Sequence, residues 1–156
     1  MAVPKKITNF LEKRKVKYKI LEHKKVFTAL DKSKTLKVPE KIVGKTLVVK
    51  FDKSLAMVLI GANKILDFQK LKKFLGKEAK LVSEKLIKNK IKGVKLGAIP
   101  PFGNLWGMKT FVDRSLKKER KIILNSGDWR FSIEISPKDL EKLIEGLTWG
   151  NFSKRK

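Results

Sequence analysis

The 156-residue sequence contains no cysteine and a single histidine, His23. The lack of cysteine excludes disulfides, thiolate metal sites and a cysteine nucleophile. Because structural and catalytic zinc sites draw mainly on cysteine and histidine ligands, no conventional zinc site is expected either. These absences predict a protein of the cytoplasm.

Long hydrophobic runs are also missing. The longest runs, such as residues 55–60, have the length of a strand and fall well short of the ~20 apolar residues that span a membrane. The opening residues, Met-Ala-Val-Pro-Lys-Lys, lack the apolar segment of a signal peptide, so no membrane partner is expected. A hydrophobic fraction of 42% and nine phenylalanines predict a globular chain, and residues 1–156 suit a single domain.

Negative charge is scarce, since 15 acidic residues face 39 basic ones and give a net charge of +24. Such an excess attracts polyanions, of which RNA and DNA are the obvious class. The cations are nearly all lysine and are spread along the whole chain, with arginine only at positions 14, 114, 120, 130 and 155. A lysine bias of this kind also arises from genome composition or heat adaptation. The charge therefore supports a nucleic-acid partner without identifying it.

Hydrophobic periodicity predicts both helices and strands. Helices are expected at residues 5–15, 28–36, 67–75, 83–89 and 136–145. Strands are expected at residues 16–21, 42–49, 55–60, 79–82, 109–113, 121–124 and 130–135. Because helices mix with adjacent and separated strands, the predicted fold is α/β (mixed), a mixed sheet flanked by helices. The basic tail, residues 151–156, is expected to be frayed.

One segment, residues 93–113, follows neither helical nor strand periodicity. It contains four glycines and the adjacent pair Pro100 and Pro101. Glycine permits backbone conformations that other residues resist, and proline fixes its own φ. Loops of this length are uncommon inside compact domains and often bind ligands. The apolar residues of the segment predict packing against the domain, which leaves a ligand-binding loop and a purely structural connection as the two interpretations.

Lys45 is the strongest single candidate for a functional side chain, because it interrupts an apolar strand, where a charged group needs a partner or a ligand. A half-buried lysine beside a cleft can hold an anionic or carbonyl oxygen. The alternative is a lysine at a strand end whose ammonium group reaches water. His23 is a candidate general base, or a surface residue at a strand end. Asp113 either orients a ligand or caps the turn that follows it.

Several short segments form an ordered set over roughly residues 16–146. They are Val26-Phe-Thr-Ala29, Val38-Pro39, Gly44-Lys-Thr-Leu-Val-Val49, Ile65-Leu-Asp-Phe68, Leu71 to Gly76, Gly97-Ala-Ile-Pro-Pro-Phe-Gly103, Thr110-Phe-Val-Asp113, Ser126-Gly127 and Ser136-Pro-Lys-Asp-Leu140. In this set the chain resembles the YbaK/EbsC family of aminoacyl-tRNA deacylases, which is related to the editing domain of bacterial prolyl-tRNA synthetases. No single motif is decisive, but the ordered set is specific.

The resemblance implies a twisted, partly barrel-like mixed β-sheet flanked by helices. It implies a free-standing trans-editing hydrolase, an aminoacyl-tRNA deacylase that cleaves the ester between a wrong amino acid and the terminal ribose of tRNA. The implied partner is mischarged tRNA, with an aminoacyl-tRNA synthetase as a further candidate, and no metal or other cofactor is implied. The alternative is a non-catalytic tRNA-binding accessory module of a synthetase complex. A nucleic-acid-binding protein unrelated to editing is disfavoured by the absence of arginine clusters.

The resemblance also assigns candidate site residues. In the family a strand lysine lies at the active site, and Lys45 matches it. A Gly-x-x-x-Pro loop matches Gly97 to Pro101, and its backbone is expected to hold the aminoacyl carbonyl and the attacking water. The implied substrate-binding residues are Thr28, Ala98, Ile99, Pro100, Asp113 and Gly127, with His23 as a further candidate.

Two departures from the family pattern bear on specificity. Other members carry Gly-Gly-Ile-Ser-Pro in the loop, so the methyl group of Ala98 and the rigid Pro100 are expected to narrow the pocket or change what it accepts. Relatives with this form of the loop often have histidine after Gly-Asp near the last hairpin, where this chain has Trp129. No imidazole role is therefore carried over to that position, and the identity of the amino acid is not carried over either.

Overall fold

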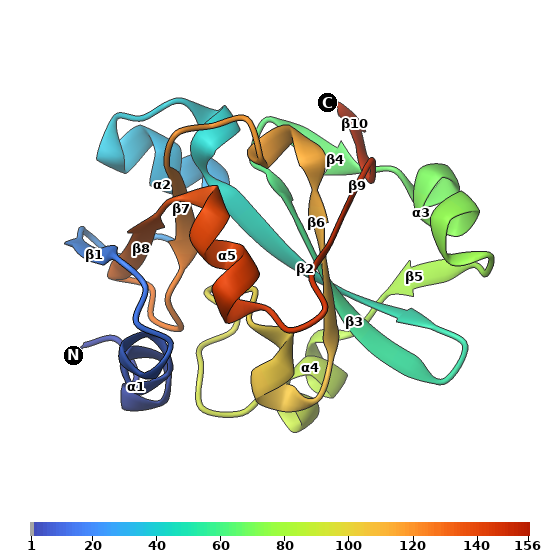
Figure 1. Cartoon of the computed structure of the whole chain (residues 1–156), viewed down its shortest axis with the longest axis horizontal. Helices are drawn as coiled ribbons and strands as arrows, with labels where there is room; N and C mark the ends of the chain where they lie inside the picture. The colour runs from blue at the N-terminus through green and yellow to red at the C-terminus, as the bar shows by residue number, and fades with distance from the viewer. Residues whose placement is uncertain (1) are drawn as a thin grey trace.

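The computed structural model describes residues 2–156 and shows a mixed α/β fold (Figure 1). The helices are α1 (Lys5–Lys13), α2 (Ala29–Leu36), α3 (Phe68–Leu75), α4 (Glu84–Lys90) and α5 (Pro137–Leu143), with 3₁₀ turns η1 (Glu40–Ile42), η2 (Gly103–Trp106) and η3 (Arg114–Leu116). The strands are β1 (Tyr18–Glu22), β2 (Gly44–Phe51), β3 (Ser54–Gly61), β4 (Lys64–Leu66), β5 (Ala79–Leu81), β6 (Lys109–Asp113), β7 (Ile122–Asn125), β8 (Phe131–Ile135), β9 (Thr148–Gly150) and β10 (Ser153–Arg155). Within the described residues, every helix is too short or too polar to cross a bilayer.

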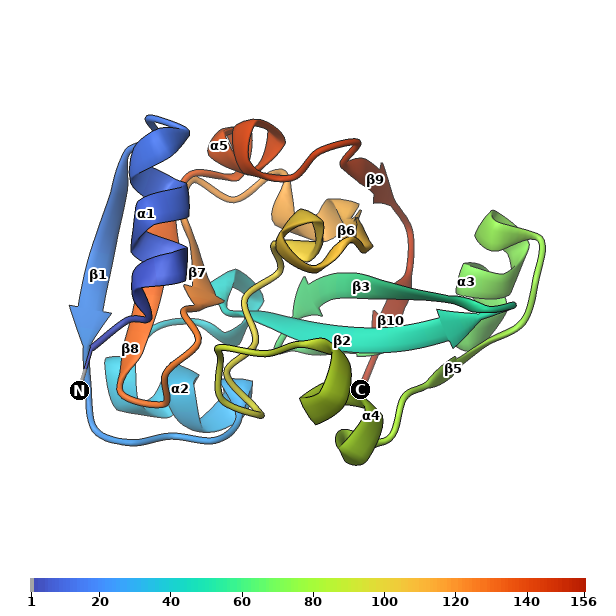
Figure 2. The ribbon, with the colours of Figure 1, turned by 90° about the horizontal axis from the view of Figure 1, so that it is seen from below.

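The largest sheet has the strand order β5-β2-β3-β6-β9. Its centre is the antiparallel hairpin of β2 and β3, while β6 pairs in parallel with β3 and β9 pairs in parallel with β6. A second, antiparallel sheet has the order β1-β8-β7. Figure 2 shows this smaller sheet beside α1 and α2, next to the long β2–β3 hairpin. The sheet is therefore mixed, as the sequence predicts.

The two sheets meet at the start of β2, where Val43 forms a parallel bridge with Ile123 just before β7 continues to Asn125. Gly44 lies at this junction, and a Cβ atom there would lie 2.8 Å from Leu59 Cδ1 and 3.2 Å from Leu124 Cδ2. Glycine therefore permits the close approach of β2 to β7. This junction brings the end of β7 next to the strand that carries Lys45.

Both faces of β2 are packed, which explains why the strand appears in the sequence as an apolar run. Val48 packs with Met57 and Ile99 on one face. Leu47 and Ile60 belong to a different cluster on the other face, together with a group of aromatic and aliphatic side chains, Phe51, Val58, Phe111 and Phe152. The segment containing residues 93–108 thus packs against the face of β2 that carries Val48.

The predicted starts of α2, α3, α4 and α5 are confirmed by side-chain caps. Thr28 accepts a hydrogen bond from the Asp31 N–H at 3.1 Å, and Ser136 accepts one from Lys138 N–H at 3.3 Å before Pro137 opens α5. Asp67 caps α3, which ends at Gly76 with φ of 75°. Each such cap contributes about 1 kcal/mol. The cap on α2 has a further consequence, because it fixes the position of Thr28 beside the loop.

The prediction of a frayed basic tail is wrong. Residues Ser153–Arg155 form β10, which pairs antiparallel with β4. Phe152 is fully buried among Leu71, Phe111 and other core residues. The tail is ordered because this one aromatic side chain completes a core, although the residues around it are charged. Strands of three residues such as β4, β9 and β10 are too short to show a period of two.

Candidate active site

A small cavity lies between the Gly97–Pro101 loop, the start of α2 and the turn from β7 to β8. Its volume is about 10 Å³, which is room for about one water molecule. The residues that line it are Val26, Phe27, Thr28, Lys32, Gly97, Ala98, Asn125, Asp128 and Trp129. Of the predicted site residues, the structure therefore brings together Thr28, Gly97 and Ala98.

The loop is held from one side by the turn between β7 and β8. Gly127 N–H donates to the Ala98 carbonyl at 2.7 Å, and the Gly127 carbonyl accepts from Lys95 N–H at 2.9 Å. A Cβ atom on Gly127, whose φ is +99°, would meet Val94 Cγ1 at 2.8 Å. Gly127 thus positions the loop through its backbone, and its N–H group already has a partner.

Two side chains also anchor the loop. Trp129 Nε1 donates to the Leu96 carbonyl at 2.7 Å, and Asn125 Nδ2 donates to the Ile99 carbonyl at 3.1 Å. Ile99 is buried against Val48 and Met57, and the two prolines that follow, Pro100 and Pro101, are buried as well. The loop therefore has a fixed shape.

Gly97 adopts a φ of +85°, which L side chains rarely take, and a Cβ atom there would lie 3.3 Å from the Phe27 carbonyl oxygen. The backbone conformation favours glycine here, and any side chain would also require the Phe27 carbonyl to shift slightly. Within residues 2–156, the N–H groups of Gly97 and Ile99 have no hydrogen-bond partner. Unpaired N–H groups on a fixed loop are donors that a carbonyl or an oxyanion can use.

Lys32 is a functional candidate that the sequence reasoning missed. It follows Thr28 by one helical turn on the same face of α2, and only 4% of its surface is exposed. Its ammonium group donates to Asn125 Oδ1 at 2.7 Å. Burial lowers the pKa of Lys32 from 10.5 to about 8. The i, i+4 spacing from a cap residue was the one signal in the sequence that could have identified it.

Asp128 supplies negative charge next to the same cavity. Its side chain is 5% exposed, and Oδ2 lies 3.1 Å from Lys95 Nζ. Burial alone would raise the pKa of Asp128, but the hydrogen bond from Arg130 N–H and the Lys95 ammonium together hold it below its ordinary value. Asp128 is therefore ionised at neutral pH and serves to orient Lys95.

His23 lies near the cavity without lining it. Its Nε2 atom is 2.8 Å from Ser132 Oγ and its Nδ1 atom is 2.8 Å from the Lys24 carbonyl. Burial lowers the pKa of His23, and the positive charge of Lys32 lowers it further, against opposing contributions from the Lys24 carbonyl and Asp128. The imidazole is therefore neutral at pH 7, and its two nitrogens are occupied by the protein.

Lys45 is half-buried on β2 and does not line the cavity. It shares its face of β2 with Leu47, whereas Ile99 of the loop packs against Val48 on the other face. Burial lowers the pKa of Lys45, with Lys156 lowering it further and Glu40 opposing them. Lys45 follows Val43 by two residues on β2, and Val43 forms an isolated parallel bridge with Ile123 of β7. Lys45 thus lies close in sequence to the junction of the two sheets but outside the cavity.

Asp113 lies outside this cavity. Its carboxylate accepts the Phe152 N–H at 2.8 Å and also bonds the hydroxyl and N–H of Ser115. The side chain is 2% exposed. These contacts support the turn-capping interpretation of Asp113. They also connect the segment before β10 to β6.

An aromatic ledge, formed by Phe27 and Trp129, borders the cavity. The two ring centroids are 5.0 Å apart in an edge-to-face arrangement. Lys25 and Lys95 lie 4.8 Å and 4.9 Å from the Trp129 ring, and Phe27 is 56% exposed. Exposed rings beside cations are the features with which proteins stack nucleobases.

The described residues contain no cluster of three or more His, Asp or Glu side chains that could hold a metal ion. The site is instead built from backbone N–H groups, amides and lysines. Such a site can bind an anionic or carbonyl oxygen and place a water molecule next to it.

Comparisons with solved structures identify the fold. A hypothetical protein of known crystal structure superimposes with a TM-score of 0.87 at 23% identity, over 96% of this chain and 99% of that one. A candidate trans-editing enzyme for prolyl-tRNA synthetase gives a TM-score of 0.85 at 20% identity, over 96% of each chain. A candidate signal transduction protein from Marinobacter aquaeolei VT8 gives 0.76 at 15% identity, over 97% of this chain and 31% of that one.

A search of curated protein sequences finds no match. The sequence model of the aminoacyl-tRNA editing domain, in contrast, matches residues 23–143. This range includes α2, β2, the Gly97–Pro101 loop and the turn from β7 to β8, so it contains every residue that lines the cavity. The chain therefore belongs to the family of aminoacyl-tRNA editing domains.

Proposed function

We propose that this chain is a free-standing trans-editing hydrolase of the cytoplasm, which removes a wrongly attached amino acid from tRNA. The observation that carries the proposal is the fixed loop at Gly97–Pro101. Gly97 and Ala98 line a cavity that also contains the buried cation Lys32, and within residues 2–156 the Gly97 N–H group has no hydrogen-bond partner. Family membership supports editing as the reaction. The neighbour described as a candidate trans-editing enzyme supports action outside a synthetase.

In the proposed reaction, a water molecule attacks the ester carbonyl carbon while loop N–H groups bind the carbonyl oxygen. Negative charge develops on this oxygen in the transition state. Donors that are already fixed in place stabilise this charge and so accelerate acyl transfer. The bond from the carbonyl carbon to the ribose oxygen then breaks, and the ribose oxygen takes up a proton. The products are a free amino acid and tRNA with an intact terminal ribose.

Lys45 is proposed to hold the ribose or the terminal phosphate, and Lys32 to add positive charge beside the carbonyl. Neither lysine is required to remove a proton from water if the neighbouring ribose hydroxyl does so. The ledge of Phe27 and Trp129 is proposed to stack the terminal base, with Lys25 and Lys95 close to the adjoining phosphate. No step requires a metal ion.

The size of the cavity indicates a small substrate side chain. With a volume of about 10 Å³, it accepts little more than a methyl group unless Phe27 or Trp129 moves. Ala98, which lines the cavity, adds its methyl group to this limit. Selecting by size suits editing, because a synthetase pocket discriminates against one missing methylene by only ~1–3 kcal/mol and needs a second site to remove the smaller product.

The test is deacylation of a panel of aminoacyl-tRNAs, including Ala-tRNA(Pro) and Cys-tRNA(Pro), by wild type and Lys45→Ala. Lys50→Ala is the matched control, since Lys50 is an exposed lysine of the same strand. We expect wild type and the control to hydrolyse one small aminoacyl ester and Lys45→Ala to lose at least tenfold in rate. Equal rates for the two variants would show that Lys45 has no role in the reaction. Absence of hydrolysis for every ester in the panel would refute the proposed deacylase activity.

A second candidate is a non-catalytic tRNA-binding accessory module of a synthetase complex. The observation in its favour is the small size of the cavity, which in the present conformation has room for about one water molecule and not for an aminoacyl group. The two candidates differ in one measurement. Tight binding of tRNA without hydrolysis of any ester would favour the accessory module, and a synthetase would then be the partner to seek.

A further inference from the structure

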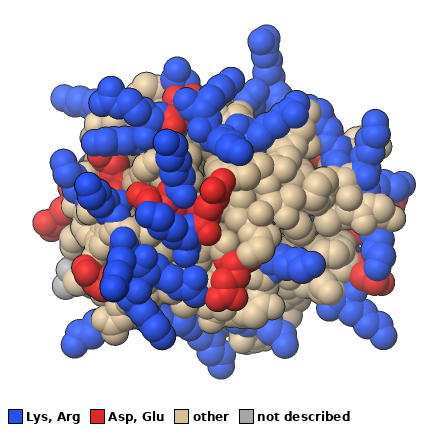
Figure 3. All heavy atoms as spheres, viewed as in Figure 1, with Lys and Arg blue, Asp and Glu red and all other residues tan. Residues whose placement is uncertain are grey.

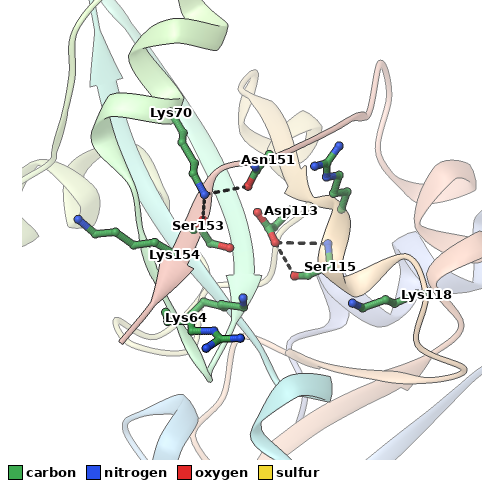
Figure 4. A pocket seen from close by; sticks show the side chains of 10 residues that line it. Lys64, Lys70, Asp113, Ser115, Lys118, Asn151, Ser153 and Lys154 are labelled. Atoms are coloured by element: carbon green, nitrogen blue, oxygen red, sulfur yellow. Dashed lines mark hydrogen bonds between the residues drawn. The ribbon is translucent and has the colours of Figure 1, made fainter.

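A second, larger groove lies between β10, η3 and α3 (Figure 4), and it shares no lining residue with the cavity at the loop. Its volume is about 500 Å³. Basic side chains from separate segments of the chain converge on it, and these are Lys64, Lys70, Arg114, Lys118, Lys154 and Arg155. The remaining lining residues are Asp113, Ser115, Asn151 and Ser153.

Asp113 is the one carboxylate of this groove, and its oxygens are already engaged. One oxygen accepts the Phe152 N–H and the other bonds Ser115. Figure 4 shows Asp113 between Lys70 and Lys118, with its hydrogen bonds directed to Ser115. Since the carboxylate is 2% exposed, the charge that the groove presents to a ligand is positive.

The groove is built by the fold and does not arise from mobile side chains alone. The Lys70 ammonium donates to the Ser153 carbonyl at 2.8 Å and to Asn151 Oδ1 at 3.4 Å, which fixes β10 against α3. The buried Phe152 and its bond to Asp113 fix the same segment against η3. The tail predicted to be frayed is thus one rigid wall of the groove.

General basicity does not account for this groove. Basic side chains cover much of the face seen in Figure 3, and some of them, such as Lys77 with Asp52, are paired with carboxylates. Within residues 2–156, no carboxylate pairs with any of the six groove cations. The groove also holds two of the five arginines of the chain, Arg114 and Arg155, and arginine suits phosphate better than lysine does.

We propose that this groove binds the sugar-phosphate backbone of an RNA strand. Unpaired cations neutralise phosphates, while Ser115, Asn151 and Lys70 supply the polar groups that backbone contacts use without reading sequence. The choice of RNA as the polyanion rests on the proposed function. Because the groove is separate from the ester cavity, it would hold the tRNA away from the esterified end and leave the choice of amino acid to the loop.

The test measures the affinity of the full chain for uncharged, fluorescently labelled tRNA as a function of salt. The groove variant combines Arg114→Ala, Lys118→Ala and Lys154→Ala, which are exposed residues at the groove. The control variant combines Arg120→Ala, Lys85→Ala and Lys90→Ala, which removes the same number of arginines and lysines from exposed positions elsewhere. A thermal melt of each variant confirms that it is folded.

We expect the groove variant to bind tRNA at least about tenfold more weakly at low salt and to lower the slope of log affinity against log salt by about two to three. The control should change the slope by less than one. The single variant Lys118→Glu should weaken binding in the same direction. Equal changes in the two triple variants would overturn the groove, because they would assign binding to the general charge of the surface.

This outcome is independent of the proposed hydrolysis, since uncharged tRNA is measured. If the wild-type chain hydrolyses no aminoacyl ester but the groove variant loses tRNA affinity, RNA binding at the groove is supported and the proposed hydrolysis is refuted. If the wild-type chain hydrolyses an ester but both triple variants bind tRNA equally well, the proposed hydrolysis is supported and RNA binding at the groove is refuted. If a vesicle of anionic lipid competed with tRNA for wild type and for the control but not for the groove variant, the groove would be a general anion site and RNA specificity would be refuted.

Discussion

The ammonium group of Lys32 on α2 is hydrogen-bonded to Asn125 Oδ1 at 2.7 Å, and Nδ2 of the same amide donates to the Ile99 carbonyl of the loop at 3.1 Å. One amide therefore connects a buried cation with the backbone that borders the cavity. Within residues 2–156, no carboxylate pairs with Lys32, and its burial lowers its pKa to about 8. A cation that loses its charge this close to neutrality makes the site sensitive to pH.

The first prediction concerns stability. The pKa of Lys32 is about 8 in the folded chain and 10.5 in the unfolded one, so between these values the unfolded state binds more protons. The free energy of unfolding therefore rises with pH across this window, by at most roughly 3 kcal/mol. Urea denaturation below, within and above the window measures this rise.

The comparison is with Lys32→Met, which fills a similar space without a charge and so isolates the contribution of Lys32. Wild type should gain stability relative to this variant as pH rises from about 8 to 10.5. A constant difference between the two proteins over the whole range would show that Lys32 has an ordinary pKa.

The second prediction separates backbone strain from crowding at the loop. Gly97→Ala places a Cβ atom 3.3 Å from the Phe27 carbonyl at φ of +85°, while Gly107→Ala has φ of +70° and no atom within 4 Å. Both variants should lose roughly 1–2 kcal/mol of stability from the left-handed backbone. Only Gly97→Ala should lower the deacylation rate, by tenfold or more, because only there does the loop have to move. A similar loss of rate in Gly107→Ala would assign the effect to stability alone.

The third prediction concerns the aromatic ledge. Phe27→Ala should weaken binding of a short single-stranded RNA that ends in CCA by about 5- to 160-fold, because a stacked base contributes ~1–3 kcal/mol. Leu81→Ala is the control, since Leu81 and Phe27 are both 56% exposed. Neither change should lower the melting temperature appreciably. Equal affinities of the two variants, measured by fluorescence anisotropy, would show that the ledge does not stack a base.

Much of the fold could be predicted from local sequence. The caps at Thr28, Asp67 and Ser136, the stop at Gly76 and the β2–β3 hairpin depend on residues close in the chain, and all are found in the structure. What could not be predicted depends on distant pairing. Each of β4, β9 and β10 has three residues and is defined only by its partner strand.

The candidate site divides in the same way. The loop could be found from its glycines and prolines, because these residues constrain the backbone locally. Lys32 was missed, because its position four residues after a cap is a weak signal and its contact with Asn125 joins residues 93 positions apart. Asp113 was ambiguous in sequence, and its contact with the Phe152 N–H, 39 positions away, is what gives it a structural role.

That contact leads to the fourth prediction, for Asp113→Ala. The substitution leaves the buried Phe152 N–H without an acceptor, which costs about 1–3 kcal/mol. The control is Asp52→Asn, which removes the charge of an exposed ion pair with Lys77, keeps a side chain that tolerates the φ of 58° at this position, and should cost less than about 1 kcal/mol. Urea denaturation measures both losses, and deacylation is measured at a temperature where each variant is folded.

We expect Asp113→Ala to be the less stable variant and to hydrolyse its ester at the wild-type rate, because the Asp113 carboxylate lies outside the cavity. The opposite pattern, with unchanged stability and a rate lowered tenfold or more, would place Asp113 at the substrate. If Asp113→Ala is both slower and less stable, the variant Ser115→Ala decides between the two explanations. It removes one hydrogen-bond partner of the Asp113 carboxylate and keeps its charge. If Ser115→Ala is also slower at a temperature where it is folded, the position of the Asp113 carboxylate affects the reaction. The cavity at the loop and the second groove would then be coupled through β6.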